Sequence, residues 1–201
     1  MFSLSKLAND RSNRLVIASA AMFEAKATIS LFEKKNIPFT YIEIGIGAIQ
    51  ASAMSKSLSP LVEGRHVLFL GSCGTSATFN SPYLVQAESV HWSPGDVRRG
   101  QGYLVPNAEP SIQLRSLSAQ RIDSVEIVCS SSIALLSEDK PDIYENLELY
   151  SVARNWMPLA ETMTAVLGVT NHIGPHAHSE WVKNFKDVAF QTSNYFEQLL
   201  S

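Results

Sequence analysis

The sequence has little of what marks several large classes of protein. It has two cysteines, Cys73 and Cys129, too few for a disulfide framework, and both stand in apolar surroundings where we expect buried, inert thiols. The net charge of −3 lacks the basic surplus of a dedicated nucleic-acid-binding protein. No apolar run has the length of a membrane span, and the first residues contain no continuous hydrophobic segment. We therefore expect a cytoplasmic protein without nucleic-acid or membrane partners.

Short apolar strands alternate with helical patterns along the chain. Apolar residues make up 45% of the 201 residues, enough for a sizeable core in one domain. Strands are expected at 15–19, 39–44, 65–70, 84–90, 125–129 and 163–170. Helices are expected at 20–32, 48–58, 145–156 and 181–200. This alternation predicts a single α/β domain over residues 1–201, with a mixed, largely parallel central sheet flanked by helices and a loosely ordered segment at 1–13.

Small and polar residues follow three of the expected strands, where an open α/β sheet places its ligands. Glu24 stands at the first strand-to-helix junction, although a solvated first-turn glutamate, favoured by the helix dipole, is the alternative. Gly45 and Gly47 form a G-I-G junction that lacks the third glycine of a dinucleotide fingerprint. Residues 71–76, G-S-C-G-T-S, are expected to form a loop that cradles an anion or a sugar oxygen, or a simple turn.

The stretch from residue 145 to 171 carries the most informative pair of side chains. The expected helix, opening after Pro141-Asp142, presents Glu148 on the same face as Val152 and Trp156. The uncharged strand 163–170 ends abruptly in Asn171. A carboxylate can hold a diol and an amide can recognise the edge of a heterocycle, so this pair predicts a small-molecule site.

Other motifs are interpreted as structural. The segment 91–103 has the composition of a surface loop or lid. His172, His176 and His178 have no accompanying carboxylate or cysteine cluster, so we expect exposed histidines and no metal site. The aromatic stripe that begins at Trp181 is typical of a helix face packed on a core.

Taken in order, these segments resemble the nucleoside phosphorylase and nucleosidase superfamily, whose members cleave N-glycosidic bonds. The resemblance rests on G-I-G before a small-residue helix, G-S-C-G at 71–74, Asn146-Leu147-Glu148 in place of an acidic-Met-Glu motif, and V-T-N-H-I-G-P at 169–175. The N-x-x-G-P motif followed by Trp181 is most similar to futalosine hydrolases, which remove hypoxanthine from a modified inosine during menaquinone synthesis.

The resemblance implies a role for each matched residue. Glu148 would bind the ribose 2′- and 3′-hydroxyls, and Leu147 stands where a methionine usually packs under the sugar. Ser72 would lie near the attacking water or phosphate. Gly47 and Gly74 belong to the junctions beside that pocket.

The resemblance also implies how the base and the water are handled. Asn171 would contact the purine N7 and its 6-substituent, and an asparagine suits a 6-oxopurine. Hydrolases of the superfamily activate water with a glutamate in the first strand-to-helix loop. An ungapped match places Ala25 at that position, and Glu24, one residue earlier, takes the role if the match shifts by one.

These residues predict hydrolytic cleavage of a purine nucleoside, inosine- or futalosine-like, without a cofactor or metal. A phosphate-dependent phosphorylase is the first alternative, and a purine-binding protein without catalysis on the same fold is the second. The resemblance also implies a homodimer or a higher homo-oligomer.

Overall fold

The structure is a computed structural model, and it describes residues 12–98, 100, 103–104, 111–116, 122–132 and 143–201. Within this part of the chain, eight strands pair into one sheet. The strands are β1 (Leu15–Ser19), β2 (Thr40–Glu43), β3 (His66–Thr75), β4 (Tyr83–Trp92), β5 (Ser111–Gln113), β6 (Asp123–Cys129), β7 (Tyr144–Asn146) and β8 (Thr162–His172). The helices are α2 (Met22–Lys34), α3 (Ala48–Ser57), η1 (Ser59–Leu61), α4 (Gly95–Arg98), α5 (Leu149–Trp156) and α6 (Ala177–Leu199).

The sheet is mixed and closes on itself. Parallel pairs join β2 to β1, β1 to β3, and β3 to β8. Strand β8 pairs antiparallel with β4, which continues in parallel through β6 to β7. Strand β7 then returns antiparallel to β3, so that β3, β8, β4, β6 and β7 form a closed ring. The α/β fold with a mixed sheet is confirmed, and its closure is a further finding.

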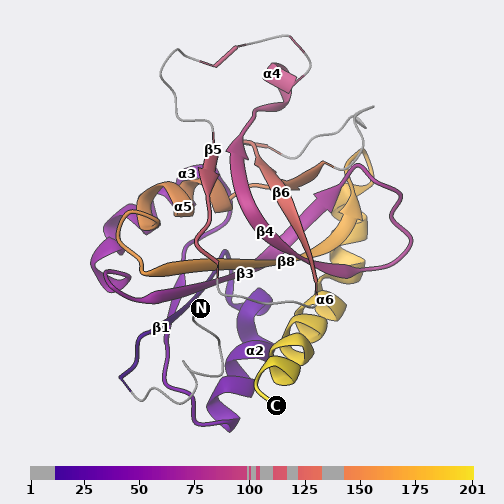
Figure 1. Ribbon diagram of the computed structural model, residues 1–201. Coiled ribbons are helices and arrows are strands. Elements are labelled where there is room, and N and C mark those ends of the chain that lie inside the picture. Colours follow the sequence, from indigo (N-terminus) through magenta and orange to yellow (C-terminus); the bar gives the residue numbers. More distant parts are fainter. Residues whose placement is uncertain (1–11, 99, 101–102, 105–110, 117–121, 133–142) are drawn as a thin grey trace.

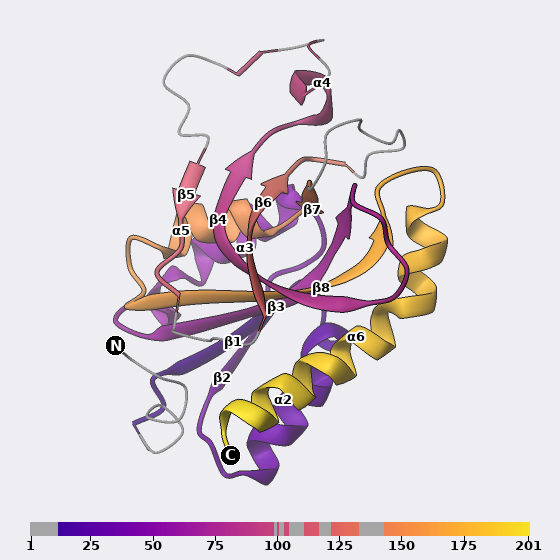
Figure 2. The same cartoon turned by 45° about the vertical axis from the view of Figure 1, so that its right-hand side comes forward.

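Helices cover the sheet in two pairs (Figures 1 and 2). Helices α2 and α6 lie side by side on one face, and α3 and α5 lie together on the other. Strand β1 serves both faces, because successive side chains of a strand point in opposite directions. Leu15 and Ile17 join the core under α2 and α6, whereas Val16 and Ala18 join the core that contains α3 and α5 residues.

Helix α6 approaches β8 closely. A Cβ atom added to Gly168 would lie 1.6 Å from Cγ1 of Val188, so only a glycine fits there. Asn184 donates a hydrogen bond to the carbonyl of Thr170 (2.7 Å), and Glu180 accepts one from the backbone N–H of His172 (2.7 Å). These contacts hold the start of α6 against the end of β8.

Several expected boundaries are wrong. Strand β3 continues through Gly71–Thr75, where a loop was expected, because this segment pairs with β8 and β7. Residues Tyr144–Asn146 form β7, so the helix expected from residue 145 begins at Leu149. Strand β4 extends to Trp92 and α4 follows it within the expected loop 91–103. The expected helix opening at Pro141-Asp142, and residues 1–11 of the expected N-terminal segment, lie outside the described residues.

Candidate active site

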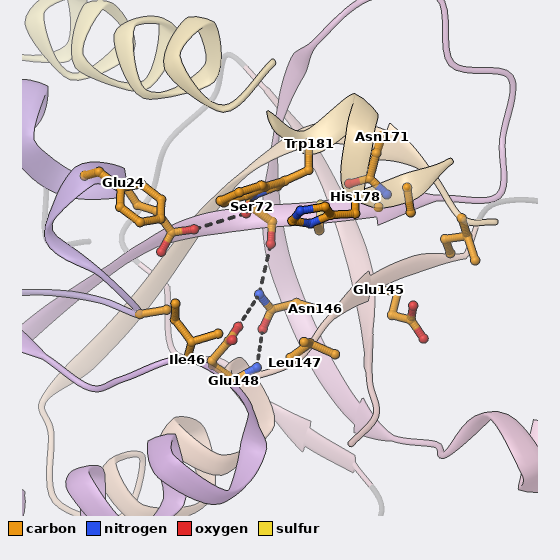
Figure 3. A pocket seen from close by; sticks show the side chains of 16 residues that line it. Glu24, Ile46, Ser72, Glu145, Asn146, Leu147, Glu148, Asn171, His178 and Trp181 are labelled. Carbon is orange, nitrogen blue, oxygen red and sulfur yellow. Dashed lines mark hydrogen bonds between the residues drawn. The ribbon is translucent and has the colours of Figure 1, made fainter. Parts of the chain in front are cut away.

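A pocket of about 260 Å³ opens where the strand ends and helix starts converge (Figure 3). Its lining comes from the β1–α2, β2–α3 and β7–α5 junctions, the ends of β3 and β8, and the start of α6. This volume is close to the lower end of the range for small-molecule sites, about 300–1,000 Å³. The pocket therefore lies where α/β sheets bind ligands, and its wall includes polar atoms from segments distant in sequence.

Glu148 enters the pocket from the residue just before α5. Its Oε1 accepts a hydrogen bond from the backbone N–H of Gly47 (2.8 Å), and its Oε2 accepts one from Nδ2 of Asn146 (3.1 Å). Burial raises the pKa of Glu148, and the donated hydrogen bonds oppose that rise. Each oxygen keeps acceptor capacity for a ligand, because a carboxylate oxygen accepts more than one hydrogen bond.

Asn146 organises this corner, and no pattern in the sequence assigned it that role. Its Oδ1 accepts hydrogen bonds from the backbone N–H groups of Glu148 (2.9 Å) and Leu149 (2.7 Å), which gives two backbone donors at the start of α5 an acceptor. Its Nδ2 also donates to the carbonyl of Ser72 (3.0 Å). One amide thereby fixes α5, the Glu148 carboxylate and strand β3 relative to one another.

Glu24 faces Glu148 from the start of α2. Its Oε1 accepts a hydrogen bond from the Ser72 hydroxyl (3.0 Å), while its Oε2 is buried without a partner among the described residues. Burial, and secondarily the negative charge of Glu148, raise the pKa of Glu24 to about 8, although the Ser72 hydroxyl and the backbone N–H groups of Ala21 and Ala20 oppose this shift. Ala25 is fully buried in the core and does not line the pocket.

Asn171 reaches the pocket because strand β8 is irregular at that point. The register against β3 shifts between Cys73 and Gly74, which brings Gly74 opposite Asn171. A Cβ on Gly74 would lie 2.7 Å from Nδ2 of Asn171, so the glycine leaves space for the amide. The Oδ1 of Asn171 accepts from the Thr170 hydroxyl (2.8 Å), and Nδ2 donates to the His172 carbonyl (3.1 Å). The Nδ2 of that amide carries a second N–H besides the one donated to His172.

An aromatic wall completes the side of the pocket next to Glu24. Trp181 stacks on His178 (centroids 5.9 Å apart) and on Phe185 (5.1 Å), and the Phe23 ring meets it edge-on at 5.8 Å. The aromatic stripe of α6 was expected to be core, and its members Val188, Tyr195 and Phe196 are buried. Trp181 is instead half-buried and lines the pocket.

An ion pair forms part of the opposite wall. Arg98 and Glu145 are 2.8 Å apart, with side chains only 5% and 6% exposed. Arg98 also donates to the carbonyl of Ser93 (2.6 Å), and Ser130 donates to Glu145 (3.1 Å). The guanidinium is therefore committed to structural contacts.

The structure brings the sequence-predicted site residues together. The pocket is lined by Glu24, Ser72, Gly74, Leu147, Glu148 and Asn171. The backbone N–H of Gly47 donates a hydrogen bond to Glu148. Lining residues that the sequence did not assign to the site include the polar or aromatic side chains Phe23, Glu145, Asn146, His178 and Trp181. His176 and His178 are exposed as expected, whereas His172 is half-buried.

Cys73 and Cys129 are both buried and free, and burial raises the pKa of each thiol, as the sequence predicted for inert cysteines. Within the described ranges, no three histidine, cysteine or acidic side chains gather as metal ligands. The helices of the same ranges include none with the length and apolarity needed to cross a membrane.

Comparison with solved structures identifies the fold. The 5′-methylthioadenosine/S-adenosylhomocysteine nucleosidase of Neisseria meningitidis, in complex with methylthio-immucillin-A, matches with a TM-score of 0.72 and 13% identity, covering 94% of this chain and 98% of that chain. Futalosine hydrolase of Helicobacter pylori matches with a TM-score of 0.67 and 11% identity, covering 92% and 96%. The corresponding nucleosidase of Chlamydia trachomatis matches with a TM-score of 0.70 and 13% identity, covering 92% and 95%.

No protein-family model and no curated protein sequence matches the chain. At identities of 11–13% the structural matches establish the fold. The chain has the fold of methylthioadenosine/S-adenosylhomocysteine nucleosidases and futalosine hydrolase. The resemblance predicted from the order of the sequence motifs is thus confirmed at the level of fold.

Proposed function

We propose that this protein hydrolyses the N-glycosidic bond of a purine nucleoside. The observation that carries the proposal is a single pocket with two buried carboxylates in different states of constraint. Glu148 is held by Gly47 and Asn146, whereas Glu24 keeps one buried oxygen without a partner among the described residues. Pairs of carboxyl groups with distinct environments commonly divide the work of binding and proton transfer.

Each polar group has a step in the proposed reaction. Glu148 accepts hydrogen bonds from the ribose 2′- and 3′-hydroxyls and fixes the sugar above Leu147. Water attacks C1′ and transfers a proton to Glu24, while the electron pair of the glycosidic bond passes to the purine. The departing purine takes up a proton from solvent and leaves as the free base, and Glu24 then returns its proton to solvent. A general base with a pKa near the working pH is well matched to this transfer, and that of Glu24 is raised to about 8.

The base is proposed to be a 6-oxopurine such as hypoxanthine, from an inosine- or futalosine-like nucleoside. With Oδ1 of Asn171 accepting from Thr170, the available group of the amide is an N–H donor. A donor complements O6 or N7, both acceptors, and stabilises negative charge as the base departs.

We expect Asn171→Asp to narrow or invert the preference for inosine over adenosine, by at least about 10-fold in the ratio of kcat/KM. The physical reason is that a neutral amide is replaced by a group that donates only when protonated, which leaves a 6-oxo substituent without its donor. Steady-state kinetics on both nucleosides measures the ratio. A wild-type protein that prefers adenosine contradicts the assignment of Asn171.

Hydrolysis is favoured over phosphorolysis by the charge of the pocket. Phosphate is usually held by arginine forks. The described lining of this pocket contains no lysine or arginine, and Arg98 is engaged by Glu145 and Ser93. Water therefore suits this pocket better than a phosphate nucleophile.

The decisive experiment is incubation with inosine, futalosine and methylthioadenosine, each with and without phosphate, with chromatography of the released base. Phosphate-independent release of hypoxanthine is the expected result. Release that requires phosphate supports the phosphorylase, and binding without release supports the non-catalytic alternative. A homo-oligomer is also proposed, and light scattering of the purified protein tests it.

A further inference from the structure

A chain of two hydrogen bonds links α6 to the Glu24 carboxyl. The indole Nε1 of Trp181 lies 3.0 Å from Oγ of Ser72, and that Oγ lies 3.0 Å from Oε1 of Glu24 (Figure 3). The three residues belong to α6, β3 and α2, so the chain depends on the folded sheet and not on local sequence.

The direction of this chain is determined by the donors available. An indole N–H can only donate, and a serine hydroxyl has a single proton. Because Trp181 donates to the Ser72 oxygen, the Ser72 proton is available for Glu24. Oε1 of Glu24 accepts this proton in a hydrogen bond and keeps acceptor capacity for a second donor.

We propose that Trp181 is a positioning residue that acts through Ser72 and fixes the orientation of the Glu24 carboxylate, which takes the proton from the attacking water. This inference rests on the proposed nucleosidase function. In the step concerned, one O–H bond of water breaks, its proton forms a bond to the Glu24 carboxylate, and the hydroxyl oxygen forms the new bond to C1′. The C1′–purine bond breaks and the purine carries away its electron pair.

The Trp181 indole is packed in a way that fixes the direction of its N–H group. Its ring is packed by His178, Phe185 and Phe23, which restricts rotation of the N–H away from Ser72. A phenylalanine at this position keeps those ring contacts and lacks the donor. Trp181→Phe is therefore a specific test of the hydrogen bond.

Several titratable groups surround Glu24 and contribute to any pH profile of the site. Glu148 faces it across the pocket, and Tyr41 and Glu43 lie on the neighbouring strand β2. His178 lines the same pocket from α6. The Ser72 hydrogen bond lowers the pKa of Glu24, so a hydroxyl free to turn away allows that pKa to rise.

The kinetic test compares Trp181→Phe, Ser72→Ala and the double variant on the substrate that the wild type cleaves. Trp181→Phe is expected to lower kcat about 3–10-fold with KM unchanged, and to move the base limb of the pH profile to higher pH. The double variant is expected to be no slower than Ser72→Ala, because both changes break the same chain. Trp92→Phe removes an indole N–H outside the pocket lining and serves as the matched control.

A second measurement separates this inference from the proposed function, because it needs no turnover. In isotope-labelled protein, the indole N–H resonance of Trp181 is expected to shift in Ser72→Ala, while those of the other two tryptophans stay in place. The Glu24 carboxyl resonance, assigned through Glu24→Gln, is expected to titrate at higher pH in Trp181→Phe. Unchanged resonances, or a multiplicative loss in the double variant, overturn the relay even if cleavage is observed. Shifted resonances without any cleavage support the relay and contradict the nucleosidase.

Discussion

Two strand-to-helix junctions bring a glutamate into the same pocket, and they hold it differently. At the β7–α5 junction, both oxygens of Glu148 accept hydrogen bonds, from Gly47 and Asn146. At the β1–α2 junction, one oxygen of Glu24 accepts from Ser72 and the other is buried without a described partner. The first carboxylate is anchored before any ligand arrives, whereas the second retains a site for a proton.

Two identical side chains can therefore have separate tasks in one pocket, one in binding and the other in proton transfer. Anchored acceptors suit the recognition of a rigid diol, because little side-chain freedom is lost when the ligand binds. A desolvated and incompletely paired carboxyl has a raised pKa, which increases its strength as a base once it is ionised. Substitutions at one junction or the other test whether binding of the sugar and proton transfer depend on different glutamates.

The largest effect is expected from Glu24→Gln. Without a general base, single-turnover cleavage should slow by about 10²–10⁴-fold, while affinity for the product base changes little, since the base acts on water in the transition state. Rapid-quench kinetics and calorimetric titration with hypoxanthine on the same variant measure both quantities.

A control for Glu24→Gln comes from its stability. Burial raises the pKa of Glu24 above its value in the unfolded chain, so stability from this group is lost as the pH rises towards about 8. The glutamine variant should therefore be more stable than wild type above that pH in urea unfolding. Unaltered cleavage in such a folded variant would falsify the role of Glu24 as the base.

The next effect is expected at the anchored carboxylate. Glu148→Gln should lower kcat/KM for a ribonucleoside by about 10²-fold, because two hydrogen bonds to a charged group are weakened. The loss should be much smaller for the 2′,3′-dideoxynucleoside, which has no diol to bind. Equal losses on both substrates contradict the ribose-binding role and indicate a structural one.

The pH dependence tests the other junction in the wild type. Because Glu24 must lose its proton to act and its pKa is raised to about 8, kcat/KM should increase about 50-fold from pH 6 to pH 8 and then level off. The increase should be absent in Glu24→Gln, and in Glu148→Gln it should occur at lower pH, because the negative charge of Glu148 contributes to the raised pKa of Glu24. A wild-type profile that is flat over this range is incompatible with a base of raised pKa.

Sequence patterns predicted those parts of the fold and site that depend on local order. Strand β1 is a continuous apolar run and the buried face of α6 has apolar periodicity, and the polar residues at their ends were found with them. Strand β7 has three residues, too few for a period, and it exists because β3 and β6 pair with it. The second half of β3 is rich in small residues that resemble a turn, and pairing with β8 overrides that local signal.

The hydrogen bonds of the site were harder to predict than its members. Asn146 was recognised as part of a motif, but its contact with Ser72 spans 74 positions of sequence. Trp181 belongs to an aromatic stripe, and the stripe alone does not reveal that its first member extends beyond the core into the pocket. Such contacts depend on the placement of separate elements, which a single sequence does not encode as a local pattern.

The smallest effect is expected at Asn146, which donates a hydrogen bond to Glu148 at the β7–α5 junction. Asn146→Ala should lower the free energy of unfolding by about 1–3 kcal/mol, because two backbone N–H groups at the start of α5 lose their acceptor. It should also reduce kcat/KM several-fold, since Glu148 keeps the Gly47 N–H but loses its second donor. Urea unfolding and steady-state kinetics measure the two effects.

Asn155→Ala is the matched control for Asn146→Ala, because its amide binds Ser52 and Ser55 on α3, away from the pocket. It should change stability modestly and leave kcat/KM as in wild type. If Asn146→Ala destabilises the protein without slowing cleavage, the contacts of Asn146 with the start of α5 and its contact with the Glu148 carboxylate act independently. The fixed geometry of Glu148 then depends on Gly47 alone, and the contrast between the two junctions is weaker than the hydrogen bonds indicate.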